Sequence, residues 1–378
     1  MLLSLISFLT TAHRRASAVP DDPEFIFVTC QVGAESAVKA DVAREWPESR
    51  FAFSRPGFLT FKLPAALATS ETPPLRSVFA RAVGWSLGKV EGSTPEELAT
   101  AAWRLIQERR PNVAWNRLHV WPRDLAAPGH RGFEPGITPE ATAARDVLLQ
   151  QTPPADVCAA PLTTELTLTA PTGRGDRVLD CILMHDGSWW LGHHRAWTRT
   201  QCWPGGFWPG TPPATMVSRA YLKMCEALDW SQLPVRSGHR AAEIGCAPGG
   251  ASQALLDLGL NVLGIDPAQV APSVIANPNF THLKMRGADV RRRVFRGIHW
   301  LFADMNVTPQ AALQTLETIV THAEVHVRGL ITNIKLQEWS LADEVPLYLA
   351  RVRGWGFEQV AARQLGHNRQ EICVAAWQ

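Results

Sequence analysis

The sequence from residue 241 to residue 250 reads Ala-Ala-Glu-Ile-Gly-Cys-Ala-Pro-Gly-Gly, an apolar run that enters a turn of small residues. Residues 252–256 then favour a helix, and a second apolar run at 261–265 ends at Asp266. This order of strand, glycine turn, helix, strand and acid predicts a βαβ unit with an adenosine-type ligand at its carboxyl edge. A plain βα turn is the alternative. The acid, however, stands about 20 residues past the start of the turn, where a ribose binder needs it.

The composition is that of a globular protein with room for more than one core. At 378 residues the chain is long enough for two domains. An apolar content of 46% with 19% charged residues excludes a disordered chain. The net charge is only +2, so a nucleic-acid partner has to be held by a local basic surface. The seven cysteines form no CxxC pair, which favours a reducing compartment and predicts no metal site and no disulfide framework.

The N-terminal residues do not match a secretory signal. The apolar run at 2–9 lacks a basic region before it, and its charges follow at 13–15. We expect residues 1–22 to be a disordered leader outside the fold, and a transit-like leader stays open. No stretch has the length of a transmembrane helix, so the sequence predicts a cytoplasmic protein without a membrane partner.

Residues 23–203 predict a smaller α+β region. It opens with a β-α-β-β pattern, in which the last two strands join across Arg55-Pro56-Gly57. We expect strands at 24–30, 50–54, 58–63, 113–120, 163–169, 178–184 and 189–192, and helices at 33–46, 93–109 and 137–151. The stretch 204–213 is dense in proline and glycine and is the predicted linker.

Tryptophans alternate with Arg195 and Arg199 just before this linker. Aromatic rings and arginines together could stack and clamp RNA. Packing of the tryptophans at a domain seam is at least as good an interpretation. Within this tryptophan-rich stretch, only Arg195 and Arg199 remain as candidates for RNA contact.

Residues 214–378 alternate regularly between strand and helix patterns. We expect helices at 218–230, 250–259, 309–323 and 341–353, and strands at 241–245, 261–265, 281–285, 299–303, 328–334, 357–361 and 371–377. This alternation predicts a doubly wound, mostly parallel sheet of seven strands.

Charged residues stand at the ends of several of these strands. Asp304 and Lys335 each follow an apolar run, and ligand sites of open α/β sheets gather outside the carboxyl ends of strands. Glu371 begins its strand, so it reaches the same crevice only if the last strand runs antiparallel. One charge at a strand end is usually just solvated, but several that converge on one crevice predict a site.

The turn at 245–250 resembles motif I of the FtsJ-type S-adenosylmethionine-dependent RNA 2′-O-ribose methyltransferases. That family has a Lys-Asp-Lys-Glu tetrad, and the chain matches it in order with Lys223, Asp304, Lys335 and Glu371. More narrowly, the chain resembles the RlmM group, which methylates a cytidine ribose of 23S rRNA and has a THUMP-containing RNA-binding region before its methyltransferase domain. The resemblance covers residues 214–378, and the N-terminal match rests on the β-α-β-β start. Glu243 departs from the family, since many relatives have Asp there.

The resemblance implies a Rossmann-like methyltransferase domain at 214–378 and a THUMP-like RNA-binding region at 23–203. It implies S-adenosylmethionine as the cofactor, RNA (23S rRNA or a large-subunit precursor) as the partner, and no metal. The implied cofactor contacts are Ser218, Gly245, Ala247, Pro248, Gly249, Gly250, Asp266, Asp289 and Asp304.

The implied catalytic residues are the four members of the tetrad. Lys335 is the expected general base, oriented by Asp304, while Glu371 holds Lys223 or the substrate hydroxyl. We expect burial and the neighbouring Lys223 to lower the pKa of Lys335 from its reference value of about 10.4 and make it a usable base.

Two other classes of function stay open. The glycine turn with a distal acid also fits an NAD-dependent dehydrogenase, although Gly245, Gly249 and Gly250 lack the GxGxxG spacing. The chain could also be a non-catalytic RNA-binding or ribosome-assembly module. Retention of all four tetrad residues argues against that alternative.

Overall fold

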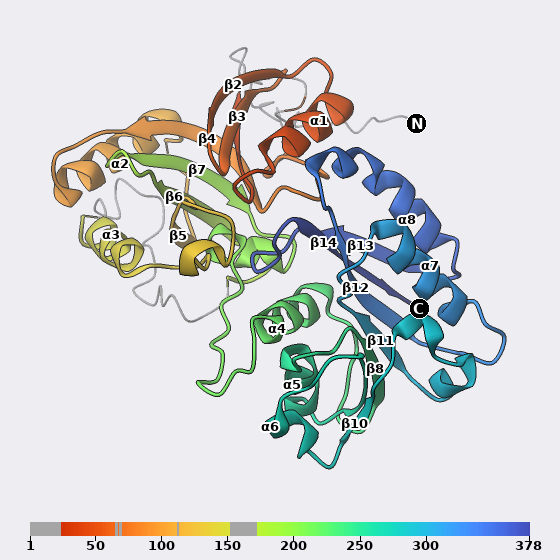
Figure 1. The fold of residues 1–378 in the computed structure, drawn as a ribbon. Coiled ribbons are helices and arrows are strands. Elements are labelled where there is room, and N and C mark those ends of the chain that lie inside the picture. Colours follow the sequence, from red (N-terminus) through yellow and green to blue (C-terminus); the bar gives the residue numbers. More distant parts are fainter. Residues whose placement is uncertain (1–23, 65–66, 68–69, 112, 152–171) are drawn as a thin grey trace, which may run out of the picture.

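The computed structural model describes residues 24–64, 67, 70–111, 113–151 and 172–378. They form two seven-stranded sheets that lie side by side, one in each half of the chain (Figure 1). The expected leader at 1–22 and the expected strand at 163–169 lie outside the described residues. In the described part of the chain, no helix has both the length and the hydropathy needed to cross a membrane.

The N-terminal sheet has the strand order β2-β3-β1-β4-β7-β6-β5. Only β5 and β6 pair in parallel; the other neighbours are antiparallel. The expected β-α-β-β start is confirmed. The strands are β1 Phe25–Thr29, β2 Arg50–Arg55, β3 Phe58–Lys62, β4 Ala82–Val90, β5 Arg117–Pro122, β6 Arg177–Leu183 and β7 Trp189–Arg195, and the helices are α1 Glu35–Glu45, α2 Pro95–Arg109 and α3 Pro139–Gln150.

The sequence did not predict the central strand β4, because glycines interrupt its pattern. Gly84 of β4 is paired with Phe27 of β1, and a Cβ at Gly84 would lie 2.5 Å from a carbon of the Phe27 ring. Gly192 of β7 leaves the same space, since its Cβ would lie 2.4 Å from that ring. The two glycines therefore accommodate a buried aromatic ring across three strands.

The C-terminal sheet has the order β10-β9-β8-β11-β12-β14-β13. Strands β8 to β12 run parallel, and β14 is antiparallel to both of its neighbours, β12 and β13. The predicted seven-stranded, mostly parallel sheet is confirmed. Its last strand runs antiparallel, which is the condition that the sequence left open for Glu371 to reach the site. The strands are β8 Arg240–Ile244, β9 Asn261–Ile265, β10 Phe280–Leu283, β11 Trp300–Ala303, β12 Gly329–Lys335, β13 Gln359–Arg363 and β14 Glu371–Trp377.

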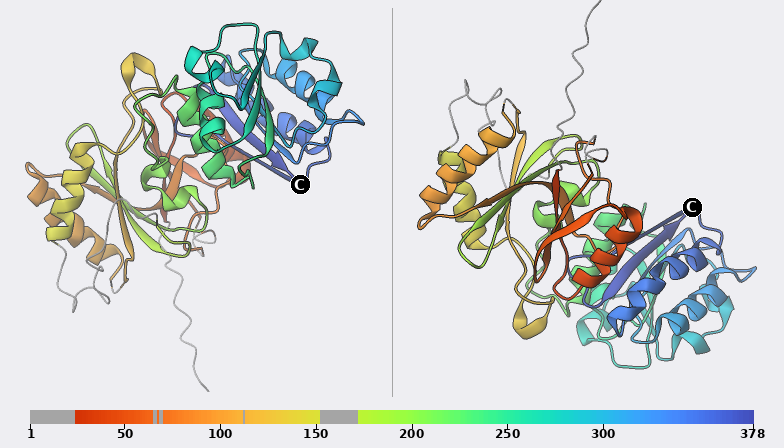
Figure 2. Two further views of the ribbon diagram at one scale, coloured as in Figure 1. Left: turned by 90° about the horizontal axis from the view of Figure 1, so that it is seen from below. Right: turned by 90° about the horizontal axis from the view of Figure 1, so that it is seen from above.

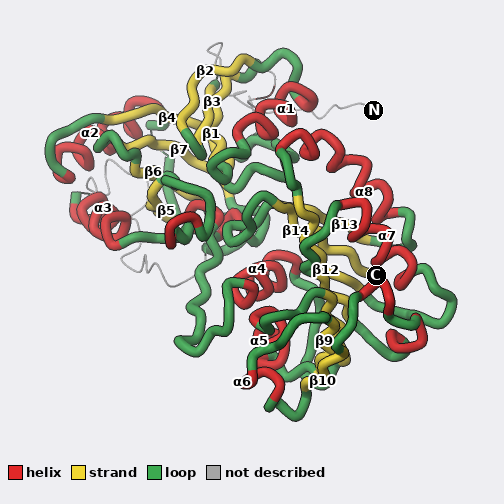
Figure 3. The backbone as a smooth tube through the Cα atoms, viewed as in Figure 1, coloured by secondary structure: helices red, strands yellow, loops and turns green. Residues whose placement is uncertain are grey.

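Helices cover both faces of this sheet (Figure 3). On one face, α4 (Ala220–Ser231) and α5 (Gly250–Asp257) pack on strand residues such as Val262 and Phe302. On the other face, α7 (Pro309–Val320) and α8 (Val345–Arg353) pack on residues such as Leu301 and Ile334. The short helix α6 (Pro272–Ile275) follows β9. Burial on both faces explains the continuous apolar runs of the central strands.

The two halves are joined by a packed seam. The hydrophobic core around α7 and α8 continues into residues of the N-terminal sheet, among them Ile26 and Trp85. Gln364 donates its backbone N–H to Val78 O at 2.8 Å, and the indole of Trp339 packs against the Phe79 ring. This continuous packing holds the N-terminal region against the C-terminal sheet.

The segment expected to be a linker, 204–213, begins with a buried turn. Phe207 is 4% exposed and lies under the guanidinium of Arg81, 4.3 Å from its ring centroid. The residues from Pro209 to Pro212 are exposed. Arg195 contacts Glu71 and Arg199 lies 2.7 Å from Asp229, so each of the two arginines has a carboxylate partner within the chain.

Candidate active site

The glycine turn connects β8 to α5 and brings the backbone close to the end of β11. Gly245 has φ +84°, and a Cβ there would lie 2.5 Å from Asp304 O. Gly250 begins α5, and a Cβ there would lie 2.2 Å from the hydroxyl oxygen of Ser218. Glycine is therefore required at both positions. A side chain at Gly245 would collide with the end of β11, and one at Gly250 would collide with the segment that leads into α4.

The acid after β9 lies beside this turn, as its position in the sequence predicted. Asp266 Oδ2 accepts the N–H of Ala247 at 3.1 Å, and its Oδ1 accepts the N–H of Ala268 at 2.8 Å. These two bonds fix the carboxylate and leave lone pairs for further donors. Asp289 is exposed in the short 3₁₀ turn Gly287–Asp289, which contacts Ile244 at the end of β8 through Gly287.

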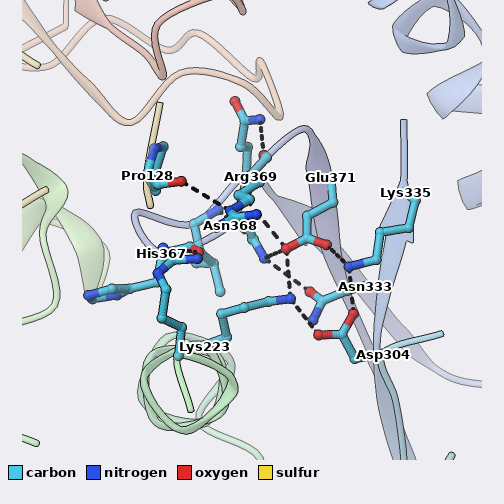
Figure 4. A network of polar contacts seen from close by, with 12 residues as sticks. Pro128, Lys223, Asp304, Asn333, Lys335, His367, Asn368, Arg369 and Glu371 are labelled. Carbon is cyan, nitrogen blue, oxygen red and sulfur yellow. Dashed lines mark hydrogen bonds and ion pairs between the residues drawn. The ribbon is translucent and has the colours of Figure 1, made fainter. Parts of the chain in front are cut away.

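The four predicted tetrad residues meet in one ring of alternating charge (Figure 4). The ammonium of Lys223 contacts Asp304 Oδ2 and lies 2.7 Å from Glu371 Oε1. The ammonium of Lys335 contacts Glu371 Oε2 and lies 2.7 Å from Asp304 Oδ1. Each lysine is therefore shared by both carboxylates. The ring draws its members from α4, the end of β11, the end of β12 and the start of β14.

Comparisons with known proteins identify relatives of the half of the chain that contains the ring. Residues 216–337 match the family model described as FtsJ-like methyltransferase. This segment is similar to FtsJ-like methyltransferases, and the half of the chain that contains it is hereafter the FtsJ-like domain. The matched segment contains Lys223, Asp304 and Lys335, while Glu371 lies beyond the matched residues.

Curated relatives are similar to the chain over part of its length. The protein named "Ribosomal RNA large subunit methyltransferase M" from Halorhodospira halophila is 32% identical over 178 residues, which is 46% of this chain and 51% of the relative. The protein of the same name from Xylella fastidiosa is 32% identical over 42% of this chain and 46% of its own length. The chain thus spans about half the length of the curated relatives it matches. Among solved structures, TrmN from Thermus thermophilus is 12% identical and covers 94% of this chain and all of its own, with a TM-score of 0.33, too low to support an argument.

The electrostatics of the FtsJ-like domain correct one expectation about Lys335. Burial alone would lower the pKa of its ammonium, but the carboxylates of Asp304 and Glu371 more than offset this, and the pKa of Lys335 lies above its ordinary value. The expected lowering of this pKa by burial and Lys223 is therefore wrong. Two carboxylates in direct contact outweigh one neighbouring cation.

Glu371 shows the opposite shift. Its side chain is only 3% exposed, and burial would raise its pKa. Lys223 and Lys335 reverse this effect and lower the pKa of Glu371 to about 2. Lys335 and Glu371 are therefore both held in their charged forms, each in contact with two other members of the ring.

Sequence reasoning missed the residues that place Glu371. The carboxylate of buried Glu226 on α4 accepts the backbone N–H groups of Gly366 at 2.7 Å and His367 at 2.8 Å, and contacts the His367 ring at 2.9 Å. The side-chain amide of Asn368 then donates to Glu371 Oε1 at 3.2 Å and to Asn333 Oδ1 at 3.1 Å. Nothing local in the sequence marks Glu226, because its partners lie 140 and 141 residues away.

A loop of the N-terminal region reaches the FtsJ-like domain at this edge. It follows β5 and is seen in yellow beside the C-terminal half in Figure 2. The guanidinium of Arg369 donates to Pro128 O at 3.2 Å, and Glu134 of the loop pairs with Arg219. Arg219 follows Ser218, and Arg369 precedes Glu371 by two residues, so both contacts lie next to predicted site residues.

Proposed function

We propose that this chain transfers a methyl group from S-adenosylmethionine to a ribose 2′-hydroxyl of RNA, with a cytidine of 23S rRNA as the target. The observation that carries the proposal is the ring of Lys223, Asp304, Lys335 and Glu371 beside the glycine turn. Methyl transfer to a hydroxyl needs a group that takes the hydroxyl proton and a frame that holds two reactants in line. The names of the curated relatives support an rRNA substrate for this domain.

The residues around the turn fit the cofactor. The hydroxyl of Ser218 is buried without a hydrogen-bond partner among the described residues, and it faces the turn at Gly250. Asp266 is fixed with lone pairs to spare for ribose hydroxyls. We therefore assign cofactor contacts to Ser218, Gly245, Ala247, Pro248, Gly249, Gly250, Asp266, Asp289 and Asp304. When bound, S-adenosylmethionine supplies the methyl group and a sulfonium positive charge.

Lys335 is our proposed general base. It accepts the proton of the 2′-hydroxyl at Nζ and must be neutral to do so. Asp304 links the turn to the ring, because its backbone lies against Gly245 and its carboxylate pairs with Lys335. A positive charge placed next to Asp304 would weaken the hold of this carboxylate on Lys335 and lower the pKa of the lysine. Lys223 and Glu371 hold Asp304 and Lys335 in place through their ion pairs and orient the ribose 2′-hydroxyl.

The N-terminal part, residues 23–203, is proposed to bind the RNA as a THUMP-like region. Its contacts with Arg219 and Arg369 support a role beside the site, because they connect it to segments that hold tetrad residues. Within this proposal the residues 204–213 link it to the methyltransferase domain at 214–378, residues 1–22 are a leader, and the protein works in the cytoplasm.

The test is methyl transfer from radiolabelled S-adenosylmethionine to 23S rRNA that lacks its modifications. We expect incorporation into one nucleotide and loss of incorporation in Lys335→Ala. The phosphodiester on the 3′ side of that nucleotide should resist alkaline cleavage, because the methylated 2′-oxygen can no longer attack the phosphorus. Arg353→Ala is the control, because Arg353 is an exposed cation at the end of α8, outside both the ring and the N-terminal region. Absence of transfer by the wild-type chain, or full transfer by Lys335→Ala, contradicts the proposal.

An NAD-dependent dehydrogenase is the second class of function that experiment has to distinguish from a methyltransferase. Hydride transfer does not explain a ring with two lysines, and the turn lacks the dinucleotide spacing. A thermal-shift comparison distinguishes the two, with stabilisation expected from S-adenosylhomocysteine and none from NAD. The reverse result would favour the dehydrogenase. Binding of RNA and cofactor without turnover would favour a non-catalytic module.

A further inference from the structure

A cavity of about 140 Å³ lies at the seam between the two sheets, away from the tetrad. Arg81, Trp121 and Trp203 line it from the N-terminal half, and Arg363 of β13 lines it from the C-terminal half. Its volume is several times the space that one water molecule requires. No residue of the charged ring or of the glycine turn is among the described residues that line it.

Three of its lining side chains have buried N–H groups that lack an acceptor. The nitrogens are Arg81 Nε, Trp121 Nε1 and Trp203 Nε1, and none has a hydrogen-bond partner among the described residues. The three side chains are 4%, 1% and 1% exposed, respectively. These groups can only donate, and a buried donor without an acceptor costs free energy. Such a set indicates a bound water or ion.

Arg363 adds a positive charge to the same cavity. Its guanidinium donates to the backbone oxygen of Arg81, and it forms no ion pair with the described part of the chain. Burial lowers the pKa of Arg363 to about 10, which leaves the group charged at neutral pH. Arg81 differs, because Asp124 lies 2.6 Å from its Nη1. Within the described residues Arg363 therefore has no carboxylate in ion-pair contact, although Glu226 stabilises its charge from a greater distance.

The acid that lines the cavity does not balance Arg363. Asp180 lies 2.7 Å from Nδ1 of His194, and Nε2 of His194 lies 2.9 Å from the backbone oxygen of Gln201. Both partners accept, so both ring nitrogens of His194 donate, and the resulting imidazolium pairs with Asp180. His119, Asp180 and His194 offer ligand atoms within 4.8 Å of one another. The commitment of both His194 nitrogens nevertheless argues against a metal ion there.

We propose that this cavity binds one tetrahedral oxyanion of phosphate or sulfate size, held by Arg363 and the free N–H groups of Arg81, Trp121 and Trp203. A guanidinium with additional N–H donors is the set that recognises such anions. Water molecules could satisfy the donors but would leave Arg363 without a counter-ion in direct contact, since Glu226 acts on it only from a distance. Because Arg81 and Arg363 come from different halves, the anion would also connect the N-terminal region to the methyltransferase sheet. The inference is independent of methyl transfer.

The test is calorimetric titration of the full-length chain with inorganic phosphate, and separately with sulfate, in a chloride buffer of constant ionic strength. We expect one saturable site per chain for the wild type. Arg363→Met keeps an apolar stem but removes the charge, and affinity should fall roughly tenfold or more. Trp203→Phe keeps the ring and removes one donor, so it should weaken binding by a smaller factor. Arg353→Met is the matched control, because Arg353 is exposed at the end of α8.

Circular dichroism and a cooperative thermal unfolding transition establish that each variant is folded. If Arg363→Met does not fold, Trp203→Phe and Trp121→Phe still test the site. Absence of a saturable site in the wild type, or an unchanged affinity in both tryptophan variants and in folded Arg363→Met, overturns the proposal. A methyl-transfer assay that fails while phosphate binds would leave this inference standing.

Discussion

Lys335 and Glu371 lie directly opposite each other on the antiparallel strands β12 and β14, and their side chains form an ion pair. Cross-strand partners in a sheet have neighbouring Cβ atoms, so the register alone brings these two groups together. Lys335 ends β12 and Glu371 begins β14, which places the pair at the carboxyl edge of the parallel strands. The antiparallel direction of one strand thus completes the candidate active site.

Replacement of Lys335 by Arg should remove activity without removing cofactor binding. Guanidinium keeps the positive charge and the contacts to Asp304 and Glu371 but cannot act as a base. We expect methyl transfer to fall by roughly 10²- to 10⁴-fold, the range of general-base catalysis. Single-turnover transfer and titration with S-adenosylhomocysteine measure the two properties. Substantial activity in this variant would mean that Lys335 only stabilises charge, and Lys89→Arg should behave like the wild type.

The pH dependence of kcat/KM should report the raised pKa of Lys335. The pH dependence of kcat/KM reports the pKa values of groups in the free enzyme. In the free enzyme, Asp304 and Glu371 stabilise the protonated form of Lys335. The rate should therefore rise with pH through neutrality and continue to rise on the alkaline side. Asp304→Asn removes one of the two carboxylates, so it should shift the rise to lower pH while reducing the maximum rate. A profile that is flat above pH 6 in the wild type would contradict Lys335 as the base.

The stability of the fold should depend on Glu371 in acid. Its pKa is about 2 in the folded chain, below the reference value of about 4.3. The carboxylate therefore contributes stability above about pH 4.3, and this contribution is lost as the pH falls toward 2. The contribution of ionised Glu371 to the free energy of unfolding is on the order of 3 kcal/mol. Denaturant unfolding of wild type and Glu371→Gln should show a difference at pH 7 that narrows by pH 2.5. A difference that stays constant over this range would mean that the folded chain does not hold Glu371 charged.

Much of the site could be predicted from residues that stand at strand ends. The turn at 245–250, Asp266, Asp304 and Lys335 each follow a clear apolar run, and parallel strands bring such ends together. The direction of the Lys335 pKa shift could not be predicted. It depends on how many carboxylates contact the ammonium, and strand patterns do not contain that number. Glu226 could not be found for a similar reason, because a buried acid on an amphipathic helix has no local signature of its distant partners.

Glu226→Gln should disturb the site from a distance. The carboxylate accepts two backbone N–H groups of the loop before β14, and an amide can offer only one oxygen to them. We expect a loss of about 1–3 kcal/mol in the free energy of unfolding. Methyl transfer should fall with little change in the affinity for S-adenosylhomocysteine, since the loop leads to Glu371 and not to the glycine turn. Glu344→Gln provides the control on the 3₁₀ turn before α8. Unchanged kcat in folded Glu226→Gln would show that the loop holds Glu371 without this acid.

Gly250→Ala should block the cofactor while leaving the fold intact. The new Cβ would lie 2.2 Å from the Ser218 hydroxyl and 2.9 Å from its backbone oxygen, so the approach to α4 must move away from the turn. Alanine is otherwise a better helix former than glycine at the start of α5. We expect the affinity for S-adenosylhomocysteine to fall at least about tenfold, the effect of one lost or strained polar contact. Gly136→Ala is the control, because a Cβ there meets nothing within 4 Å. Wild-type affinity in Gly250→Ala would place the cofactor away from the turn at residues 245–250.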